Sequence, residues 1–177
     1  LVPDWFKTLK VSKDKLFPNM NSCPDMVDLF KNTINIPLWQ DIRIKYDKGQ
    51  IIDVDVPGVP KGEEQHFVQQ HHPDQWNSAF KGYTHVKLMS PWLVTAEGPC
   101  RDIPFLMHNP SWHHTEQLGQ FNLLPGELNF AYQSATAVNM FIAPSLGPSE
   151  ITLEAGNVIA YLTPLQHDVK IELETKW

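Results

Sequence analysis

The sequence predicts an all-β domain: an antiparallel sandwich or barrel, of jelly-roll or β-clip-like form, with one short helix near the N-terminus. Apolar and polar residues alternate along several short segments, which is the pattern of half-buried strands. Fifteen prolines are spread among the 177 residues and separate these segments. Strands and long helical segments do not follow one another in turn, so a parallel α/β fold is not expected.

The chain is long enough for one domain with a hydrophobic core and too short for two of ordinary size. Residues 1–22 contain several lysines and asparagines and are expected to form an extended N-terminal arm, anchored by Trp5 and Phe6. Residues 23–177 are expected to form a single β-rich domain.

The expected helix covers residues 24–31. Pro24 fits the first turn of a helix, where a backbone N–H has no partner to lose. Asp25 and Asp28 favour the positive N-terminal end, and Asn32 is expected to end the helix.

Alternation with a period of two then predicts a succession of strands, separated by explicit turns. Pro125 and Gly126 are expected at the middle of a type II turn, and residues 154–157 are expected to close a hairpin between 151–153 and 158–162. The strands are expected within residues 34–38, 42–46, 52–56, 128–133 and 169–174.

Composition argues against several classes of partner. The formal charge is −6 and the chain has only two arginines, so the basic stripe of a nucleic-acid-binding protein is missing. No apolar run is long enough to predict a membrane-spanning helix, and no signal peptide is recognised. Cys23 and Cys100 are expected to be free thiols.

Two histidine pairs occur in nearly the same short frame, 42 positions apart. Residues 71–75 and 113–117 each read as two histidines, a spacer, a carboxylate and a glutamine. Imidazole and carboxylate are ligands of zinc and non-haem iron, so both loops are candidate metal sites. The alternative is that these are ordinary surface histidines. The candidate ligands are His71, His72, Asp74, His113, His114 and Glu116, with His66 and His108 nearby in sequence.

One sharper pattern combines His72 and Asp74 with the distal His167, two histidines and one carboxylate that would leave open positions on Fe(II). This order resembles the Fe(II)/2-oxoglutarate oxygenases, in which the distal histidine also follows a glycine-led apolar strand. The family places a basic residue, usually arginine, shortly after that histidine to bind 2-oxoglutarate. This chain offers Lys170 and Lys176 there.

Several short segments resemble a group of small uncharacterised proteins encoded by tailed phages of marine cyanobacteria. The likeness covers about 140 residues in pieces and implies a viral context without implying an activity. The matching pieces lie within residues 23–30, 36–42, 90–94, 124–126, 151–156 and 161–164.

The last third is also similar to the closing hairpins of trimeric dUTPases, where a Pro-Gly turn precedes a strand pair and a glycine-led final strand. Those enzymes use an acidic residue on the substrate hairpin to orient water. The comparable residues 126–132 offer Glu127 and no aspartate. The similarity therefore implies shared architecture and not nucleotide hydrolysis.

Together these features favour a non-catalytic phage accessory or virion-associated protein with a binding or structural role, in the host cytoplasm or the virion. Its expected partner is protein, another copy in a homo-oligomer or another virion or host protein, and no cofactor is expected. Trp76 and Trp112, beside the histidine pairs, are candidate contact residues. We also expect the two histidine loops to meet, within one chain or across a subunit boundary. The alternative function is an oxygenase that uses Fe(II) and 2-oxoglutarate.

Overall fold

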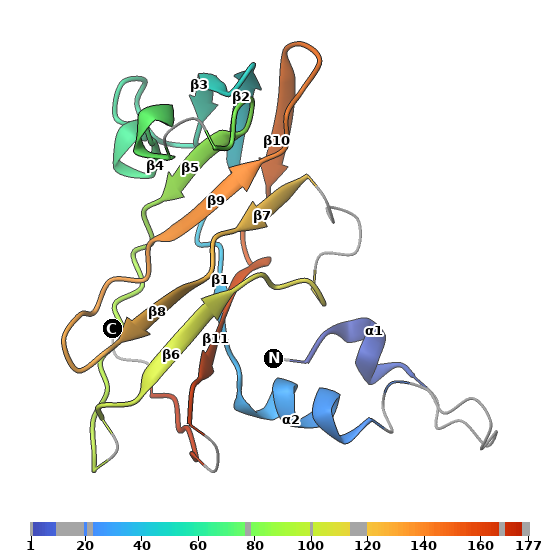
Figure 1. Ribbon diagram of the computed structural model, residues 1–177, viewed down its shortest axis with the longest axis vertical. Helices are drawn as coiled ribbons and strands as arrows, with labels where there is room; N and C mark the ends of the chain where they lie inside the picture. Colours follow the sequence, from blue (N-terminus) through green and yellow to red (C-terminus); the bar gives the residue numbers. More distant parts are fainter. Residues whose placement is uncertain are drawn as a thin grey trace.

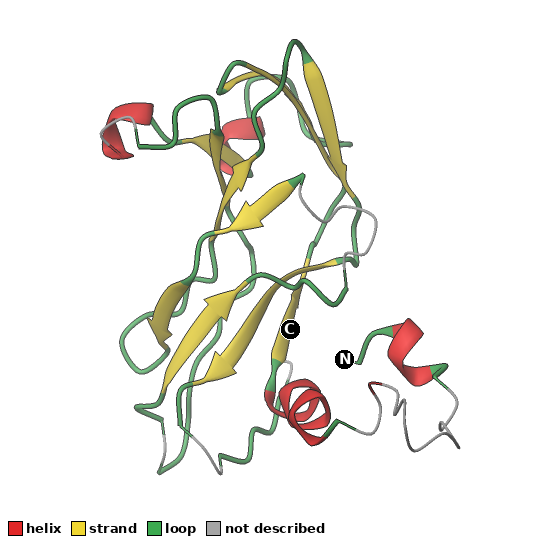
Figure 2. Cartoon of the chain, turned by 45° about the vertical axis from the view of Figure 1, so that its right-hand side comes forward, coloured by secondary structure: helices red, strands yellow, loops and turns green. Residues whose placement is uncertain are grey.

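The computed structural model describes residues 2–9, 20, 23–76, 79–99, 101–113, 120–166 and 169–174, apart from the side chains of Pro73 and Trp76. Within these residues eleven strands form three antiparallel sheets. The arrangement is sandwich-like, and the described strands do not close into a barrel (Figure 2). The predicted all-β class is confirmed, while the jelly-roll or β-clip assignment stays a prediction.

The three sheets are named here A, B and C. Sheet A has the order β1-β11-β6-β8, sheet B has β10-β2-β3, and sheet C has β4-β5-β9-β7. Sheets B and C occupy the upper half of Figure 1 and sheet A the lower half. The bounds are β1 Ile34–Pro37, β2 Ile42–Asp47, β3 Gln50–Asp55, β4 Val68–Gln70, β5 Thr84–Leu88, β6 Pro104–His108, β7 Phe121–Leu123, β8 Gly126–Asn129, β9 Val138–Ile142, β10 Ser149–Leu153 and β11 Val158–Pro164.

The helix predicted over residues 24–31 is confirmed as α2, Pro24–Asn32. Within the predicted arm, Asp4–Lys7 form the single-turn helix α1, and the Phe6 ring packs on Phe30 of α2 with centroids 4.9 Å apart. Two short 3-10 turns, η2 at Glu64–His66 and η3 at Pro73–Trp76, flank β4.

A single bent ribbon joins sheets A and B. Residues 34–47 run antiparallel to residues 149–164, because β1 pairs with β11 and β2 pairs with β10. Between the two sheets, the Leu38 N–H donates to the Asn157 carbonyl and the Leu38 carbonyl accepts from the Gly156 N–H, both at 2.8 Å. Backbone pairing therefore continues through the bend where the ribbon changes sheets.

The predicted hairpin across residues 154–157 is wrong in its strand pairing. The turn itself forms, with Gly156 in the left-handed region at φ 84° and the Asn157 N–H donating to the Glu154 carbonyl. However, β10 pairs with β2 and β11 pairs with β1 and β6, so the two strands do not pair with each other. Their shared partner is the ribbon segment about 115 residues earlier.

The predicted Pro125-Gly126 type II turn is also wrong. Gly126 begins β8 and does not have the positive φ that the third position of a type II turn requires. The two residues instead carry the chain from β7 in sheet C to β8 in sheet A.

Two predicted strands are shorter or missing. β8 ends at Asn129, whose side-chain Oδ1 accepts from the Ala131 N–H while its carbonyl accepts from the Tyr132 N–H, so a turn replaces the strand. Residues 169–174 form no strand, although Ile171 packs half-buried against the core. Alternation there reflects one-sided packing of an irregular segment.

All three sheets contribute to one hydrophobic core. Ile36 of sheet A, Ile44 of sheet B and Val86 of sheet C are buried in the same apolar cluster. None of the described helices has the length and apolar character needed to cross a membrane.

A substitution that removes buried side-chain atoms at the bend should lower the free energy of unfolding strongly. Leu38 is 2% exposed and both its backbone groups bond across the ribbon. We expect Leu38→Ala to lower the free energy of unfolding by about 2–5 kcal/mol, because it leaves a cavity in the core. The matched change Leu146→Ala, at a fully exposed leucine, should cost less than about 0.5 kcal/mol in the same urea titration. Equal effects would contradict the burial of the Leu38 side chain in the core at the bend.

Candidate functional site

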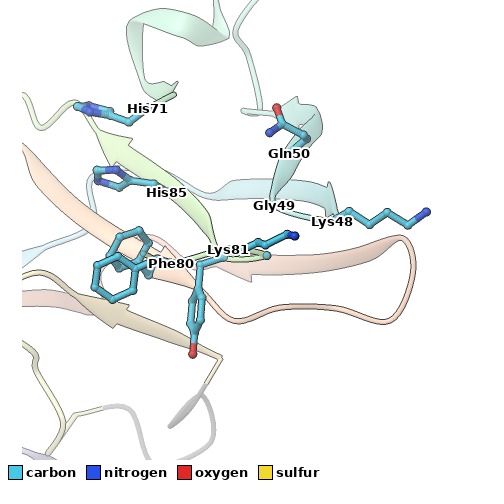
Figure 3. Close-up of a pocket in the computed structure, with 10 residues that line it drawn as sticks. Lys48, Gly49, Gln50, His71, Phe80, Lys81 and His85 are labelled. Carbon is cyan, nitrogen blue, oxygen red and sulfur yellow. The ribbon is translucent and has the colours of Figure 1, made fainter. Parts of the chain in front are cut away.

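A hollow of about 150 Å³ opens where the β2–β3 hairpin meets sheet C. Its lining comes from the hairpin tip at residues 48–50, the segment 80–83 before β5, and the side chains of His71, His85 and Phe141 (Figure 3). We call this hollow the hairpin pocket. It joins four parts of the chain, and one of its residues, His71, belongs to the first histidine pair.

The hairpin tip has a two-residue loop of unusual composition. Asp47 pairs with Gln50, so Lys48 and Gly49 make the turn, and both have positive φ, 47° and 83°. Positive φ at both positions is typical of a type I′ turn, which favours Asn-Gly or Gly-Gly. A lysine in the left-handed region costs about 1 kcal/mol relative to those residues. The strain falls on a residue that lines the pocket.

The tip is seated against sheet C by a close backbone approach. A Cβ added at Gly49 would lie 3.1 Å from the Tyr83 carbonyl oxygen, tighter than nearly all such contacts. Gly82 beside it has φ 86°, so its conformation also favours glycine. The absence of a side chain at residue 49 therefore lets the hairpin close over the sheet.

The side chain of Gln70, at the end of β4, holds the hairpin tip through three hydrogen bonds. Its Oε1 accepts from the Ile51 N–H at 2.8 Å, and its Nε2 donates to the Gly49 carbonyl at 3.0 Å and to Gln50 Oε1 at 3.2 Å. One amide side chain thus takes the place of strand pairing between β3 and β4. Both sheets hold the lysine-bearing tip in position.

Four rings form a continuous stack along one wall of the pocket. Phe80 lies 4.5 Å from Phe141, Phe141 lies 4.9 Å from His85, and His85 lies 4.5 Å from His71, centroid to centroid. Tyr83 meets Phe141 edge-on at 5.8 Å. We call the first four residues the ring stack. Phe80 is 43% and Tyr83 37% exposed, so part of this apolar wall is open to solvent.

Burial changes the pKa of one histidine of the ring stack, His85. It lowers the pKa of His85 to about 4, with a smaller contribution from the neighbouring His71. The His71 backbone N–H donates to the His85 carbonyl at 3.1 Å, and His71 Nδ1 lies 2.6 Å from Gln75 Oε1. At neutral pH His85 is therefore uncharged, and Lys48 and Lys81 bring two ammonium groups to the lining.

The predicted iron ligands are brought together only in part. His72 Nδ1 lies 3.3 Å from Asp74 Oδ2 at the start of η3, and both side chains are largely exposed, at 73% and 84%. His167, the third member, lies outside the described residues. Among the residues that are described, no group of three or more histidine, cysteine or acidic side chains is arranged to hold a metal ion.

His113, the described member of the second histidine pair, packs on sheet A. His113 Nδ1 bonds to the hydroxyl of Tyr161, a buried residue of β11. His108 of β6 packs edge-on against the same ring, with centroids 5.4 Å apart, and bonds through Nε2 to Thr163 Oγ1 at 3.0 Å. Burial raises the pKa of Tyr161 and lowers that of His108. His114 and Glu116 lie outside the described residues.

His71 and His113, the described histidines that carry ring contacts in the two pairs, do not meet within the chain. His71 packs on β5 in the upper half of the molecule, whereas His113 packs on β11 in the lower half (Figure 1). Their different strand neighbours separate them, so the expectation of one shared cluster within a chain is wrong. A meeting across a subunit boundary stays a prediction.

The structure describes the side chain of one of the two predicted contact tryptophans, Trp112. Trp112 is half-buried, and its carbonyl accepts from Trp5 Nε1 at 2.7 Å, with the two rings 6.1 Å apart. It therefore joins the N-terminal segment to the second histidine loop. The Trp76 side chain lies outside the described part of the chain.

Sequence reasoning missed most of the hairpin pocket. Phe80, Tyr83, His85 and Phe141 lie on segments without any recognisable motif. The signal that was available is the Lys48-Gly49 pair between two alternating strands, which marks a two-residue hairpin with an unusual first residue.

Comparisons with models of known protein families, with curated proteins and with solved structures found no match for this chain. The chemistry of the hairpin pocket therefore has to be inferred from its own residues.

The low pKa of His85 predicts a loss of stability in acid. Unfolded His85 binds a proton near pH 6.5 and folded His85 only near pH 4, so the unfolded state holds the extra proton between these values. Stability should be full above pH 6.5 and should fall as the pH drops towards 4, by about 2 kcal/mol at pH 5. Thermal melts at pH 8 and 5 should show a drop of about 4–8 °C from this residue.

His85→Phe removes the titrating group and keeps a ring in the stack, so its melts should depend less on pH than those of the wild type. His66→Gln, at an exposed histidine, serves as the control and should leave the pH dependence unchanged. Parallel curves for wild type and His85→Phe would mean that the buried imidazole does not hold its proton as weakly as the packing indicates.

Proposed function

We propose that the protein is a non-catalytic binding protein whose ligand site is the hairpin pocket. The observation that carries the proposal is the pairing of an open aromatic wall with two ammonium groups, that of Lys48 at the held hairpin tip and that of Lys81 on the segment before β5. Apolar walls with a few placed polar groups are typical of ligand sites. The proposal is therefore supported by the residues that line the pocket and by the contacts that hold the hairpin tip in place.

The chemistry of the lining favours binding over catalysis. Among the described residues that line the pocket there is no carboxylate, thiol or aliphatic hydroxyl. Many hydrolytic and transfer enzymes use one of these three groups as the nucleophile or in a proton-transfer pair, so the described lining is left with lysine, tyrosine and histidine for such roles. His85 has a pKa of about 4, well below the operating range of an efficient general base at neutral pH.

We assign the protein to a tailed phage, as an accessory or virion-associated component in the host cytoplasm or the virion. The support is the piecewise resemblance to small proteins of cyanobacterial phages. In this setting a binding protein also contacts other proteins, its own copies or virion and host components. Mass spectrometry of intact virions of the phage that encodes the chain distinguishes a virion component from an accessory protein made only in the host.

Binding without turnover is tested by saturation-transfer NMR with four single-ring compounds: glucose, glucuronate, benzyl alcohol and benzoate. At least one compound should receive saturation from the wild type and remain chemically unchanged after a day. Phe80→Ala should lose this signal, because it removes the exposed end of the ring stack. Tyr132→Ala should keep it, because that tyrosine is 78% exposed and does not line the pocket.

Conversion of a compound by the wild type would argue against a non-catalytic protein, as would equal signals from both variants. The oxygenase alternative has its own arm in the same experiment. Protein incubated with Fe(II) and 2-oxoglutarate should release no succinate above a protein-free control. Succinate release that disappears in His72→Ala would replace the binding proposal with the oxygenase.

A further inference from the structure

We propose that the hairpin pocket binds a small organic anion: a single six-membered ring, aromatic or saccharide, that carries one carboxylate or phosphate group. This inference rests on the proposed binding function and adds the chemical class of the ligand. Size, ring stacking, charge and backbone strain support it separately.

The volume limits the ligand to about one ring. A hollow of about 150 Å³ is the size of an engineered protein cavity that holds benzene. Sites for larger, drug-sized ligands have about 300–1,000 Å³. A dinucleotide or an extended peptide therefore does not fit within this hollow, and a single ring with one substituent does.

The wall favours a ring with an apolar face. Phe80 stacks on Phe141 at an interplanar angle of 31°, and its outer side is open, with 43% of the residue exposed. Tyr83 stands at 87° to Phe80 and closes a corner beside it. Aromatic rings attract further rings in offset or edge-on geometry, and an added ring extends the stack. The hydroxyl-free face of a sugar offers a similar apolar surface.

The charge of the lining favours an acidic substituent. Lys48 and Lys81 line the pocket, in a chain whose formal net charge is −6. Asp47 precedes Lys48 in the chain but is not among the lining residues. Two ammonium groups with no lining carboxylate create a local positive potential that attracts an anion.

The lining side chains are arranged so that the ring of the ligand and its acidic group would contact different parts of the pocket. In Figure 3 His71 and His85 lie on the left of the pocket, and the Lys48 and Lys81 side chains lie on the right, where the Lys48 amino group points outward, away from the histidines. A ring inserted along the stack would place its charged group towards the lysines at the mouth. There the lysine ammonium groups stay hydrated while their stems cover apolar surface.

The backbone conformation of Lys48 is a separate observation that supports a ligand-binding role for this residue. Asparagine or glycine would suit the left-handed position better, yet a lysine occupies it. Residues held in unfavourable conformations concentrate at ligand sites, where the side chain they carry is needed. Gln70 and the seat of Gly49 hold this strained tip against sheet C.

Isothermal titration calorimetry with matched ligand pairs tests the proposal: benzoate with benzyl alcohol, glucuronate with glucose, and glucose 6-phosphate with glucose. In at least one pair the charged member should bind the wild type at least about tenfold more tightly. Lys48→Asn and Lys81→Gln should each weaken that binding about three- to tenfold. Lys170→Gln, at an exposed lysine outside the pocket, should bind as the wild type does.

Lys48→Asn separates binding from folding. Because asparagine suits the type I′ turn better than lysine, this variant should melt at a higher temperature than the wild type while binding more weakly. Weaker binding together with higher stability cannot come from unfolding. The aromatic and saccharide pairs decide which kind of ring the pocket takes.

Each other outcome overturns the proposal in a defined way. Equal affinity for charged and neutral members, unaffected by the lysine substitutions, removes the anionic class and leaves the proposed binding function intact. Inorganic phosphate that binds as tightly as the ring compounds removes the ring requirement. If no compound binds the wild type, both the ligand class and the proposed function fail.

Discussion

The close seat of the β2–β3 hairpin on sheet C favours glycine at residue 49. The Cβ of any other residue would meet the Tyr83 carbonyl oxygen at 3.1 Å, and the left-handed conformation at Gly49 would add strain. This contact brings Lys48 beside the ring stack, and the amide of Gln70 fixes it there. The pocket is therefore made by the docking of two sheets, and neither sheet contains it alone.

The docking depends in turn on how the ribbon of residues 34–47 and 149–164 bends. Its pairing continues through Leu38, so β2 and β3 extend from a firmly held corner. The same corner carries β11 into sheet A, where Tyr161 holds His113 and the N-terminal segment packs on Trp112. The two histidine loops thus have different roles: the first contributes to an open pocket and the second to the attachment of the N-terminal segment.

The sequence pattern predicted the elements whose formation depends on interactions between residues close together in the chain. Pro24 and the first-turn acids identified α2, and alternation identified the ribbon strands and β3. Pairing partners were not predictable, because β10 pairs with β2 and β11 with β1, each more than 100 residues away, and the turn between β10 and β11 looks like a hairpin. The histidine pairs predicted His71 as a candidate metal ligand, which stays a prediction, and its neighbours in the hairpin pocket, His85 and Phe141, come from distant strands. Only the fold reveals that grouping.

A map of backbone amide chemical shifts tests most directly whether the hairpin pocket is the ligand site. Isotope-labelled wild-type protein is titrated separately with benzoate and glucuronate, and shift changes are followed for every assigned amide. The account predicts that the changes concentrate at residues 48–50 and 80–85 and at His71. Changes centred instead on Trp5, His113 and Asn157, which line a separate hollow beside the N-terminal segment, would contradict it.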